Sequence, residues 1–306
     1  MDSGRRATLR ALAGGGALLA MKRAAPQGAA RAMRMRAIPG SGELLPVIGL
    51  GTWQVFDAGA DAAARTPLRE TLAAFARGGG KLIDSSSMYG AAEAVVGDLA
   101  AELGIAKQLF FATKVYTSGR EAGIALMEAS LRRMRVPRMD LMQVHNLVDV
   151  TEHAKSLADW KAKGRVRYTG ITHYRAGAYA EVERWLKAAP WDFLQINYSL
   201  GEREAAERLL PLAQERRVAV IANRPFAEGA LFARVRGKPL PAWAAEIGAA
   251  SWAQFFLKWI LGHPAVTCAI PGTGRPDHMA DNLAAGFGAL PDEAMRRRMA
   301  VHLDSL

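Results

Sequence analysis

From residue 45 onward, short apolar runs alternate with longer amphipathic stretches. The apolar runs are rich in Val, Ile, Leu and Phe and are bounded by Gly, Pro or polar residues, which is typical of strands buried on both faces of a parallel sheet. In the stretches between them, apolar residues recur at helical spacing. The predicted strands are Leu45–Trp53, Lys81–Ser86, Leu109–Val115, Met139–His145, Val166–His173, Phe193–Tyr198, Val218–Asn223 and Val266–Ile270.

Eight strands in strict alternation with helices predict a single α/β domain, a (β/α)8 TIM barrel over residues 37–306, rather than an open doubly wound sheet. No Gly-x-Gly-x-x-Gly run follows any predicted strand, which argues against a Rossmann domain. Residues Ala37–Glu43 predict a small hairpin over the bottom of the barrel. The predicted helices are Pro67–Arg77, Ala91–Leu103, Arg120–Met134, His153–Lys163, Ala176–Lys187, Glu202–Gln214, Trp243–Ile260, Ala284–Leu290 and Asp292–His302.

The net charge of +11 is concentrated at the start of the chain. Eight of the 40 basic residues but one of the 29 acidic residues lie in residues 1–36, which leaves +4 for the remainder. That remainder has no long basic run and no basic face with interleaved aromatic residues, so the charge does not indicate nucleic-acid binding.

Residues 1–36 are predicted to be an export leader. Arg5-Arg6, with Arg10 behind it, resembles a twin-arginine motif, although Thr8 stands where such motifs prefer an aromatic residue. The Gly-rich apolar stretch Ala11–Met21 is too short to span a bilayer, and we expect no membrane span. The resemblance implies a partner in the export machinery and a periplasmic protein. The alternative is a disordered basic tail on a cytoplasmic protein.

Three ionisable residues stand at the ends of three successive predicted strands: Asp84, Lys114 and His145. The carboxyl ends of the strands carry the active site in a parallel barrel, so these side chains should meet there, close to Tyr89 in the loop after Asp84. Each also has a structural alternative: a helix cap for Asp84, a strand-end side chain reaching water for Lys114, and a buried histidine without a catalytic role for His145.

The motifs around these residues resemble the catalytic tetrad of the aldo-keto reductases. The matching runs are Asp84 with Met88-Tyr89-Gly90, Ala112-Thr113-Lys114, and Gln143-Val144-His145-Asn146, and the resemblance extends from about residue 45 to about residue 290. It implies a (β/α)8 barrel that reduces the carbonyl of a small aldehyde or ketone with NAD(P)H.

The predicted roles also follow from ordinary acid–base chemistry. A phenol with a pKa near 10 is a weak proton donor at neutral pH, and a lysine cation beside Tyr89 lowers that pKa. Asp84 keeps Lys114 charged in a site that would otherwise desolvate it. His145 donates a hydrogen bond to the substrate oxygen. We therefore expect Tyr89 to be the general acid and base, with the other three residues supporting it.

The same resemblance implies a set of cofactor-binding residues, with departures from the family pattern. Thr172-His173 stands in place of a Ser-Asn pair, Asn223 in place of an aromatic residue that stacks on the nicotinamide, and Gly272 and His278 in place of two cations. The run from Ile270 to Asn282 resembles the family's adenosine-end segment, where Arg275 is expected to contact a 2′-phosphate. Arg224 is expected to grip the pyrophosphate, with a plain surface role as the alternative. We expect NADP, with NAD as the alternative. The predicted cofactor residues are Gly51, Thr52, Trp53, Thr172, His173, Gln195, Arg224, Phe226, Thr273, Arg275, His278, Asp281 and Asn282.

Trp53, Met88 and Tyr116 are expected to line a substrate pocket with Asn146 as a polar contact, although packing at the barrel rim is an alternative for Met88 and Tyr116.

A monomer is expected. No metal-binding cluster of His, Asp and Glu is visible in the sequence. Two other functions stay open: a nicotinamide-binding sensor with vestigial activity, and a phosphate-binding isomerase or lyase, for which a carboxylate base is lacking. Cys268, in an apolar run, is expected to be core packing rather than a reactive thiol.

Overall fold

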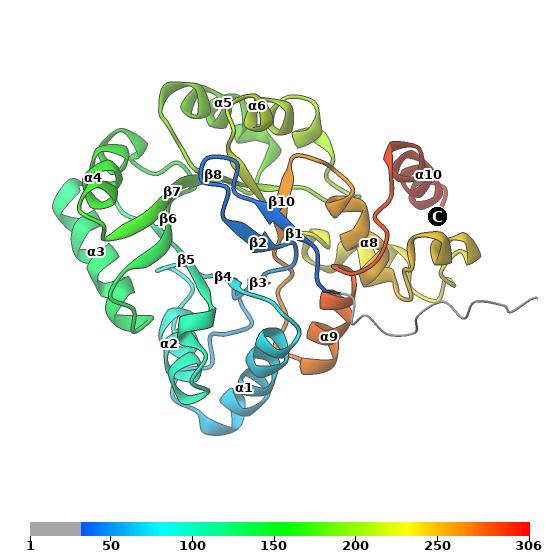
Figure 1. Cartoon of the computed structure of the whole chain (residues 1–306), viewed down its shortest axis with the longest axis horizontal. Helices are drawn as coiled ribbons and strands as arrows, with labels where there is room; N and C mark the ends of the chain where they lie inside the picture. The colour runs from blue at the N-terminus through cyan, green and yellow to red at the C-terminus, as the bar shows by residue number, and fades with distance from the viewer. Residues whose placement is uncertain (1–31) are drawn as a thin grey trace, which may run out of the picture. The chain divides into compact units, whose positions relative to one another are not determined.

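Eight parallel strands follow one another in chain order around a ring in the computed structural model, which describes residues 32–306. Each strand pairs with the next one along the chain (Figure 1). The strands are β3 (Leu50–Gly51), β4 (Leu82–Asp84), β5 (Phe110–Val115), β6 (Met139–His145), β7 (Val166–Thr172), β8 (Phe193–Asn197), β9 (Ala219–Asn223) and β10 (Val266–Ala269).

The ring closes between its first and last strands. Ile48 bridges Ala269 and Gly51 bridges Gly272, both in parallel orientation, and the backbone nitrogen of Gly49 donates to the carbonyl of Ala269 at 2.9 Å. A side chain at either glycine would collide with backbone, because an added Cβ would lie 2.8 Å from the Leu82 oxygen at Gly49 and 2.9 Å from the Ile270 oxygen at Gly51. The predicted (β/α)8 TIM barrel is therefore confirmed.

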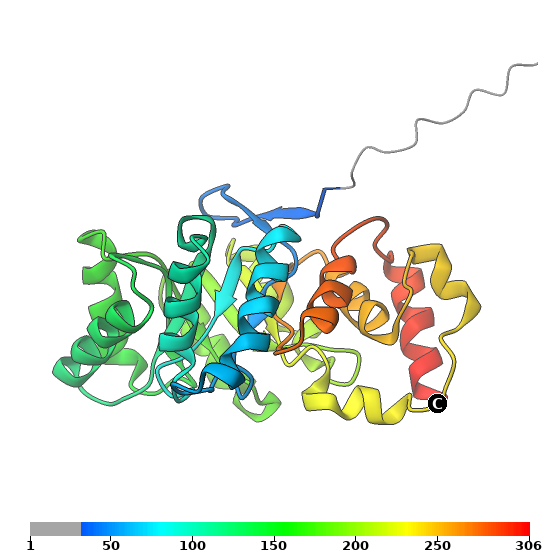
Figure 2. The same cartoon turned by 90° about the horizontal axis from the view of Figure 1, so that it is seen from below.

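Helices surround the barrel and bury their apolar faces against the outer face of the strands (Figures 1 and 2). A short 3₁₀ helix, Ala242–Ile247, precedes α8. The helices are α1 (Ala62–Arg77), α2 (Ala92–Glu102), α3 (Arg120–Arg133), α4 (Val150–Ala162), α5 (Tyr179–Ala188), α6 (Leu209–Glu215), α7 (Ala230–Arg234), α8 (Trp252–Leu261), α9 (Pro276–Ala284) and α10 (Glu293–Asp304).

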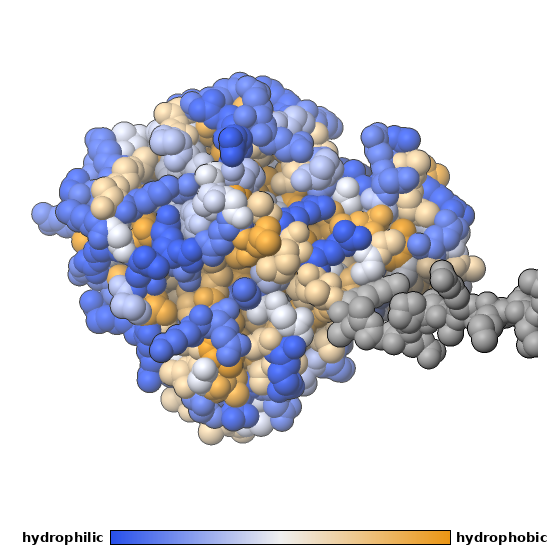
Figure 3. Space-filling model, in the orientation of Figure 1, coloured by the Kyte–Doolittle hydropathy of each residue, from blue (hydrophilic) through white to orange (hydrophobic). Residues whose placement is uncertain are grey.

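A hairpin of β1 (Met35–Ala37) and β2 (Leu44–Pro46) covers the amino-terminal end of the barrel (Figures 1 and 2). Its residues Ile38 and Leu45 belong to the apolar cluster that fills the barrel interior. Figure 3 shows this end of the molecule, where hydrophilic side chains predominate around the rim. The site predicted from the sequence therefore has to lie at the opposite end.

The folded part begins before residue 37, the start that the sequence predicts. Met33 is buried, and Arg36 in β1 donates to the backbone carbonyls of Leu261, His263 and Val266. The proposed twin-arginine motif lies outside the described residues.

The first predicted strand, Leu45–Trp53, is divided, because Leu44–Pro46 pairs with β1 in the hairpin and only Leu50–Gly51 belongs to the barrel. Two long predicted helices are also divided. The stretch Trp243–Ile260 is interrupted where Gly248 has left-handed backbone and Ser251 caps α8. The stretch Glu202–Gln214 consists of a 3₁₀ helix, Glu204–Ala206, followed by α6.

Two further helix predictions were wrong in their positions. α1 begins at Ala62 instead of Pro67, because Asp61 caps it by accepting a hydrogen bond from the backbone nitrogen of Ala63 at 2.9 Å. The predicted helix Ala284–Leu290 is replaced by α9, which ends at Ala284. Pro276 occupies the first turn of α9, where its missing N–H costs nothing.

Candidate active site

The polar ends of the strands meet at the carboxyl-terminal mouth of the barrel because inward-facing residues alternate along each strand. On β5 the inward positions run from Phe110 through Ala112 to Lys114, and on β6 from Leu141 through Gln143 to His145. Each run changes from apolar to polar toward the mouth. The same alternation delivers Asp84, Thr172, Gln195 and Asn223 to that end.

Asp84 and Lys114 form a buried ion pair. The Lys114 Nζ atom donates to Asp84 Oδ2 at 2.5 Å and to the backbone oxygen of Ser85 at 2.7 Å. The other oxygen of Asp84 accepts from the side-chain amides of Gln195 at 2.7 Å and Gln143 at 3.3 Å. Although burial opposes the charge on Lys114, Asp84 and Tyr89 outweigh it and raise the lysine pKa. The lysine is therefore a permanent cation at the floor of the mouth.

Tyr89 lies directly beside this cation. Lys114 Nζ is 5.0 Å from the centroid of the Tyr89 ring. We expected Lys114 to give Tyr89 a lowered pKa, and the lysine does act in that direction, but burial is the larger effect and the pKa of Tyr89 is raised overall. The phenol is consequently protonated throughout the neutral range, which is the state that donates a proton.

His145 completes the group. Its ring packs edge-on against Tyr89, with centroids 5.8 Å apart, and against Tyr116, with centroids 5.2 Å apart. Burial first, then Lys114 and His173, lower its pKa to about 2. The imidazole is therefore neutral. Its Nδ1 atom lies 3.0 Å from the Ser86 hydroxyl, so Nε2 is the nitrogen left to face a ligand.

The residues predicted to hold a nicotinamide lie next to this group. Thr172 donates to Gln195 Oε1 at 3.2 Å, and both side chains are buried. Asn223 donates to the backbone oxygen of His173 at 3.2 Å, and its buried Oδ1 has no partner among the described residues. The ring of His173 stacks on Tyr174 with centroids 5.6 Å apart. The mouth thus offers amide and hydroxyl groups suited to a carboxamide.

Arg224, predicted to grip a pyrophosphate, is held by carboxylates. It pairs with Glu202 at 3.2 Å and with Glu228, and its backbone is left-handed with φ of 50°. Phe226, two residues on, packs against Phe232 and Phe256 at the start of the loop leading to α7. An anion at this loop would meet a guanidinium that is already oriented, in competition with two acids.

The loop after β10 carries the residues predicted for the adenosine end. Thr273 Oγ1 accepts from the backbone nitrogen of Arg275 at 3.1 Å, and Asn282 is buried on α9. Exposed Arg275 forms a two-point pair with Asp277, and His278 is exposed beside it. Asp281 instead accepts hydrogen bonds from Ser251 and Gln254, which joins α9 to α8.

Apolar side chains surround the mouth. Trp53 is 45% exposed, Met88 47% and Tyr116 40%, so three large side chains present apolar surface to solvent here. Asn146 follows His145 with left-handed backbone, φ 50°. Gly51 lies in the barrel seam, and Thr52 is buried and donates to the Asp84 backbone oxygen at 3.0 Å. The Thr52 hydroxyl thus helps to hold the backbone at Asp84 in place.

Sequence reasoning missed two polar residues that the structure brings into this group. Gln143 donates to Asp84, and its own buried Oε1 lacks a partner among the described residues. Ser86 contacts His145. Both carried a usable signal, because Gln143 is two positions before His145 on the same face of β6, and Ser86 is two positions after Asp84.

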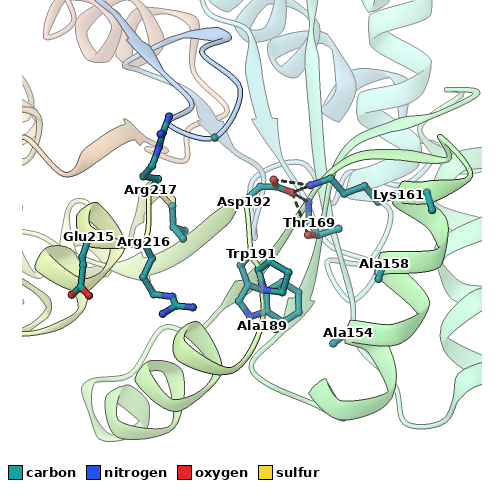
Figure 4. A pocket seen from close by; sticks show the side chains of 14 residues that line it. Ala154, Ala158, Lys161, Thr169, Ala189, Trp191, Asp192, Glu215, Arg216 and Arg217 are labelled. Carbon is teal, nitrogen blue, oxygen red and sulfur yellow. Dashed lines mark hydrogen bonds and ion pairs between the residues drawn. The ribbon is translucent and has the colours of Figure 1, made fainter.

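A groove of about 840 Å³ lies elsewhere, toward the amino-terminal end of the barrel beside α4 (Figure 4). Ala154 and Ala158 form one wall, Trp191 lies at the centre, and Lys161 is paired with Asp192 at 2.6 Å. It contains none of the four predicted catalytic side chains.

Within residues 32–306, no helix is long and apolar enough to cross a membrane, and no three His, Cys, Asp or Glu side chains are grouped to hold a metal.

Comparison with known proteins agrees with this geometry. Residues 47–301 match the model of the Aldo/keto reductase family. The chain is 32% identical over 263 residues to methylglyoxal reductase YeaE of Escherichia coli (strain K12), covering 82% of this chain and 89% of that protein. It is 26% identical over 232 residues to 6-dehydroglucose reductase of Agrobacterium fabrum, covering 63% and 73%.

Solved structures give the same result. A crystal structure of an aldo/keto reductase from Klebsiella pneumoniae in complex with NADP and acetate has a TM-score of 0.74 and 26% sequence identity, and the match covers 89% of this chain and 95% of that one. A second structure of an aldo-keto reductase from the same organism, in complex with NADPH, also has a TM-score of 0.74, at 27% identity.

Proposed function

This chain belongs to the aldo/keto reductase family, and on that premise we propose how its site carries out the family's reaction. The protein is an NADP(H)-dependent oxidoreductase that reduces aldehyde or ketone carbonyls to alcohols, reversibly. The observation that carries the assignment of roles is the contact of one protonated phenol, Tyr89, with a buried cation and a neutral imidazole at the mouth.

Reduction needs a proton at the carbonyl oxygen as negative charge develops there. Tyr89, protonated because burial raises its pKa, supplies that proton. As the phenol gives up its proton, Lys114 stabilises the phenolate that forms. Asp84 keeps Lys114 charged and in place through the 2.5 Å contact. The neutral His145 donates from Nε2 to the same oxygen and orients it toward Tyr89.

The chain's residues fit a nicotinamide dinucleotide. When bound, NADPH supplies the hydride that reaches the carbonyl carbon. The unpaired Oδ1 of Asn223, together with Thr172 and Gln195, provides the amide and hydroxyl partners that a carboxamide needs. Arg224 would hold the pyrophosphate, and Arg275, Thr273 and Asn282 the adenosine phosphate end.

We propose small aldehydes, including 2-oxoaldehydes, as substrates. The exposed rings of Trp53 and Tyr116 with Met88 form an apolar rim, and Asn146 adds one polar group next to His145. The similarity to the Escherichia coli methylglyoxal reductase supports this class. A sensor that binds nicotinamide without turnover is not favoured, because every group required for proton transfer is in contact with the next.

The function is tested with the purified full-length chain. NADPH and NADH absorbance is followed with a panel of aldehydes, 2-oxoaldehydes, ketones and quinones. We expect consumption of NADPH with aldehydes, and none in a Lys114→Met preparation, which controls for contaminating reductases. Tight NADPH binding without turnover on any member of the panel would replace the reductase with the sensor.

We further propose that the segment before the barrel is a twin-arginine leader that exports the folded protein to the periplasm. Arg5-Arg6 and the following apolar stretch support the leader. Since Met33 and Arg36 contribute to the barrel, the leader should end before them rather than at residue 36. We also propose a monomer, because the closed eight-stranded sheet of the barrel has no free strand edge.

Export is tested by fractionating cells that express the full chain. We expect a shortened protein in the periplasm, and an Arg5→Lys, Arg6→Lys variant retained in the cytoplasm. Equal cytoplasmic retention of both chains would show that the segment is a tail.

A further inference from the structure

Ser86 lies between two residues of the proposed mechanism without belonging to it. It follows β4, two positions after Asp84 and three before Tyr89, and its side chain is fully buried. The hydroxyl lies 3.0 Å from Nδ1 of His145, which is itself 5% exposed. At this distance the two groups form a hydrogen bond, so one of them donates a proton and the other accepts it.

The direction of this hydrogen bond follows from the second contact of the hydroxyl. Ser86 Oγ accepts from the backbone nitrogen of Met88 at 3.4 Å. A hydroxyl has one proton to donate, and no acceptor other than His145 contacts this one among residues 32–306. Donation to Nδ1 therefore satisfies every group, whereas a proton on Nδ1 would leave the Ser86 hydrogen without an acceptor.

The surroundings of the His145 ring restrict both its orientation and its charge. Tyr89 and Tyr116 pack edge-on against it from two elements. Burial of the ring, and after it the nearby positive charge of Lys114, lowers the pKa of His145 and keeps the ring neutral, so it carries one proton. Nε2 has no protein partner among the described residues and is not one of their buried unpaired atoms, which leaves it accessible from the mouth.

We propose that Ser86 is a positioning residue that holds His145 in the tautomer protonated on Nε2, so that His145 always presents a donor to the substrate oxygen. The inference rests on the proposed function for its catalytic consequence, but the tautomer itself does not. With a proton on Nδ1 instead, Nε2 would present a lone pair to the carbonyl oxygen and repel it.

The test compares Ser86→Ala and Ser86→Thr with the wild type in the full-length chain. ¹⁵N NMR of histidine-labelled protein reports which ring nitrogen of His145 carries the proton, with His145→Gln used to assign the signals. We expect Nε2–H in the wild type and in Ser86→Thr, and a mixture of tautomers in Ser86→Ala. Carbonyl reduction by Ser86→Ala should lose about tenfold in kcat, the worth of one hydrogen bond, while NADPH affinity measured by fluorescence stays unchanged.

Ser87→Ala is the matched control, because the Ser87 hydroxyl donates to the backbone oxygen of Lys114, whereas the imidazole is hydrogen-bonded to Ser86. It should leave the His145 signals unchanged. A proton on Nδ1 in the wild type, or unchanged tautomer and kcat in Ser86→Ala, would overturn the inference. If the wild type reduces no carbonyl, the proposed function fails, while the NMR result still decides whether Ser86 sets the tautomer.

Discussion

Burial, more than charge, sets the acid–base state of the residues at the mouth. The sequence placed Lys114 beside Tyr89 and led us to expect a lowered phenol pKa, but the depth of the ring reverses the sign. Burial also makes His145 neutral. The consequence is a site arranged to give a proton at neutral pH, with the lysine acting after the proton leaves.

Arg275 and Asp277 provide a prediction about cofactor affinity. The carboxylate holds the guanidinium at two points, with distances of 3.1 and 2.6 Å, in an exposed loop. It therefore competes with a 2′-phosphate for Arg275. We expect Asp277→Asn to bind NADPH about two- to fivefold more tightly, a range typical of an exposed ion pair, with NADH affinity unchanged.

Fluorescence titration with both nucleotides measures this effect, and Asp61→Asn, an exposed acid at the cap of α1, controls for the change in net charge. Weaker NADPH binding by Asp277→Asn would show that the carboxylate assists the phosphate site instead of competing with it.

At the scale of elements, periodicity located a run for each barrel strand, although the first run, Leu45–Trp53, also includes part of the hairpin, and several helices were misplaced or merged. The strands could be predicted because each is a short apolar run bounded by Gly, Pro or polar residues. Their alternation with helices also placed Lys114 and His145 at the same end of the barrel. The helix predicted for α1 began too late because Pro67 resembles a helix start, whereas the observed N-cap, Asp61, lies about a turn and a half earlier. No helix was predicted over Pro276–Leu283 because the stretch is short and largely polar.

Contacts across the barrel could not be read from the sequence. The position of Ser86, two residues after Asp84, places it near the site, but nothing in the order of residues indicates that it meets His145, 59 positions later, or that Asp281 contacts α8 rather than a ligand. Such contacts depend on the register between strands and on loop geometry. The family resemblance indicates residues that its members share, and it does not give these two contacts.

The hairpin at the bottom of the barrel provides a prediction about stability. Tyr168 on β7 donates to Glu43 at 2.6 Å and approaches Ser41 at 2.9 Å, so one phenol ties the hairpin to the barrel interior. Tyr168→Phe should lower the free energy of unfolding by about 1.5–3 kcal/mol, the range for a hydrogen bond to a charged group. Reductase activity should persist, because the hairpin is at the end opposite the site.

Urea unfolding with a Tyr168→Phe, Glu43→Gln double-mutant cycle measures the coupling. Purely additive effects would show that the hydrogen bond between Tyr168 and Glu43 does not help to hold the hairpin.

The whole molecule should lose stability in mild acid, in part because of His145. Its folded-state pKa of about 2 lies below the ordinary histidine value of 6.5, so the unfolded chain takes up a proton first as the pH falls below 6.5. The stabilisation is therefore present above pH 6.5 and is lost toward lower pH. Between pH 7 and pH 5 the wild type should lose about 2 kcal/mol more than His145→Gln.

Urea midpoints and slopes at the two pH values give these free energies. An equal loss in the wild type and His145→Gln would mean that the imidazole is accessible to protons in the folded protein, and would weaken its assignment as a neutral donor.

The proton transfer from Tyr89 is tested most directly by a single-turnover measurement. Enzyme loaded with NADPH is mixed with an aldehyde, and the rate of cofactor oxidation is compared among the wild type, Tyr89→Phe and Tyr116→Phe. Loss of a positioned general acid should slow Tyr89→Phe by about 10²–10⁴-fold, with NADPH affinity retained, while Tyr116→Phe stays within a few-fold of the wild type. A Tyr89→Phe enzyme that turns over at the wild-type rate would contradict the account.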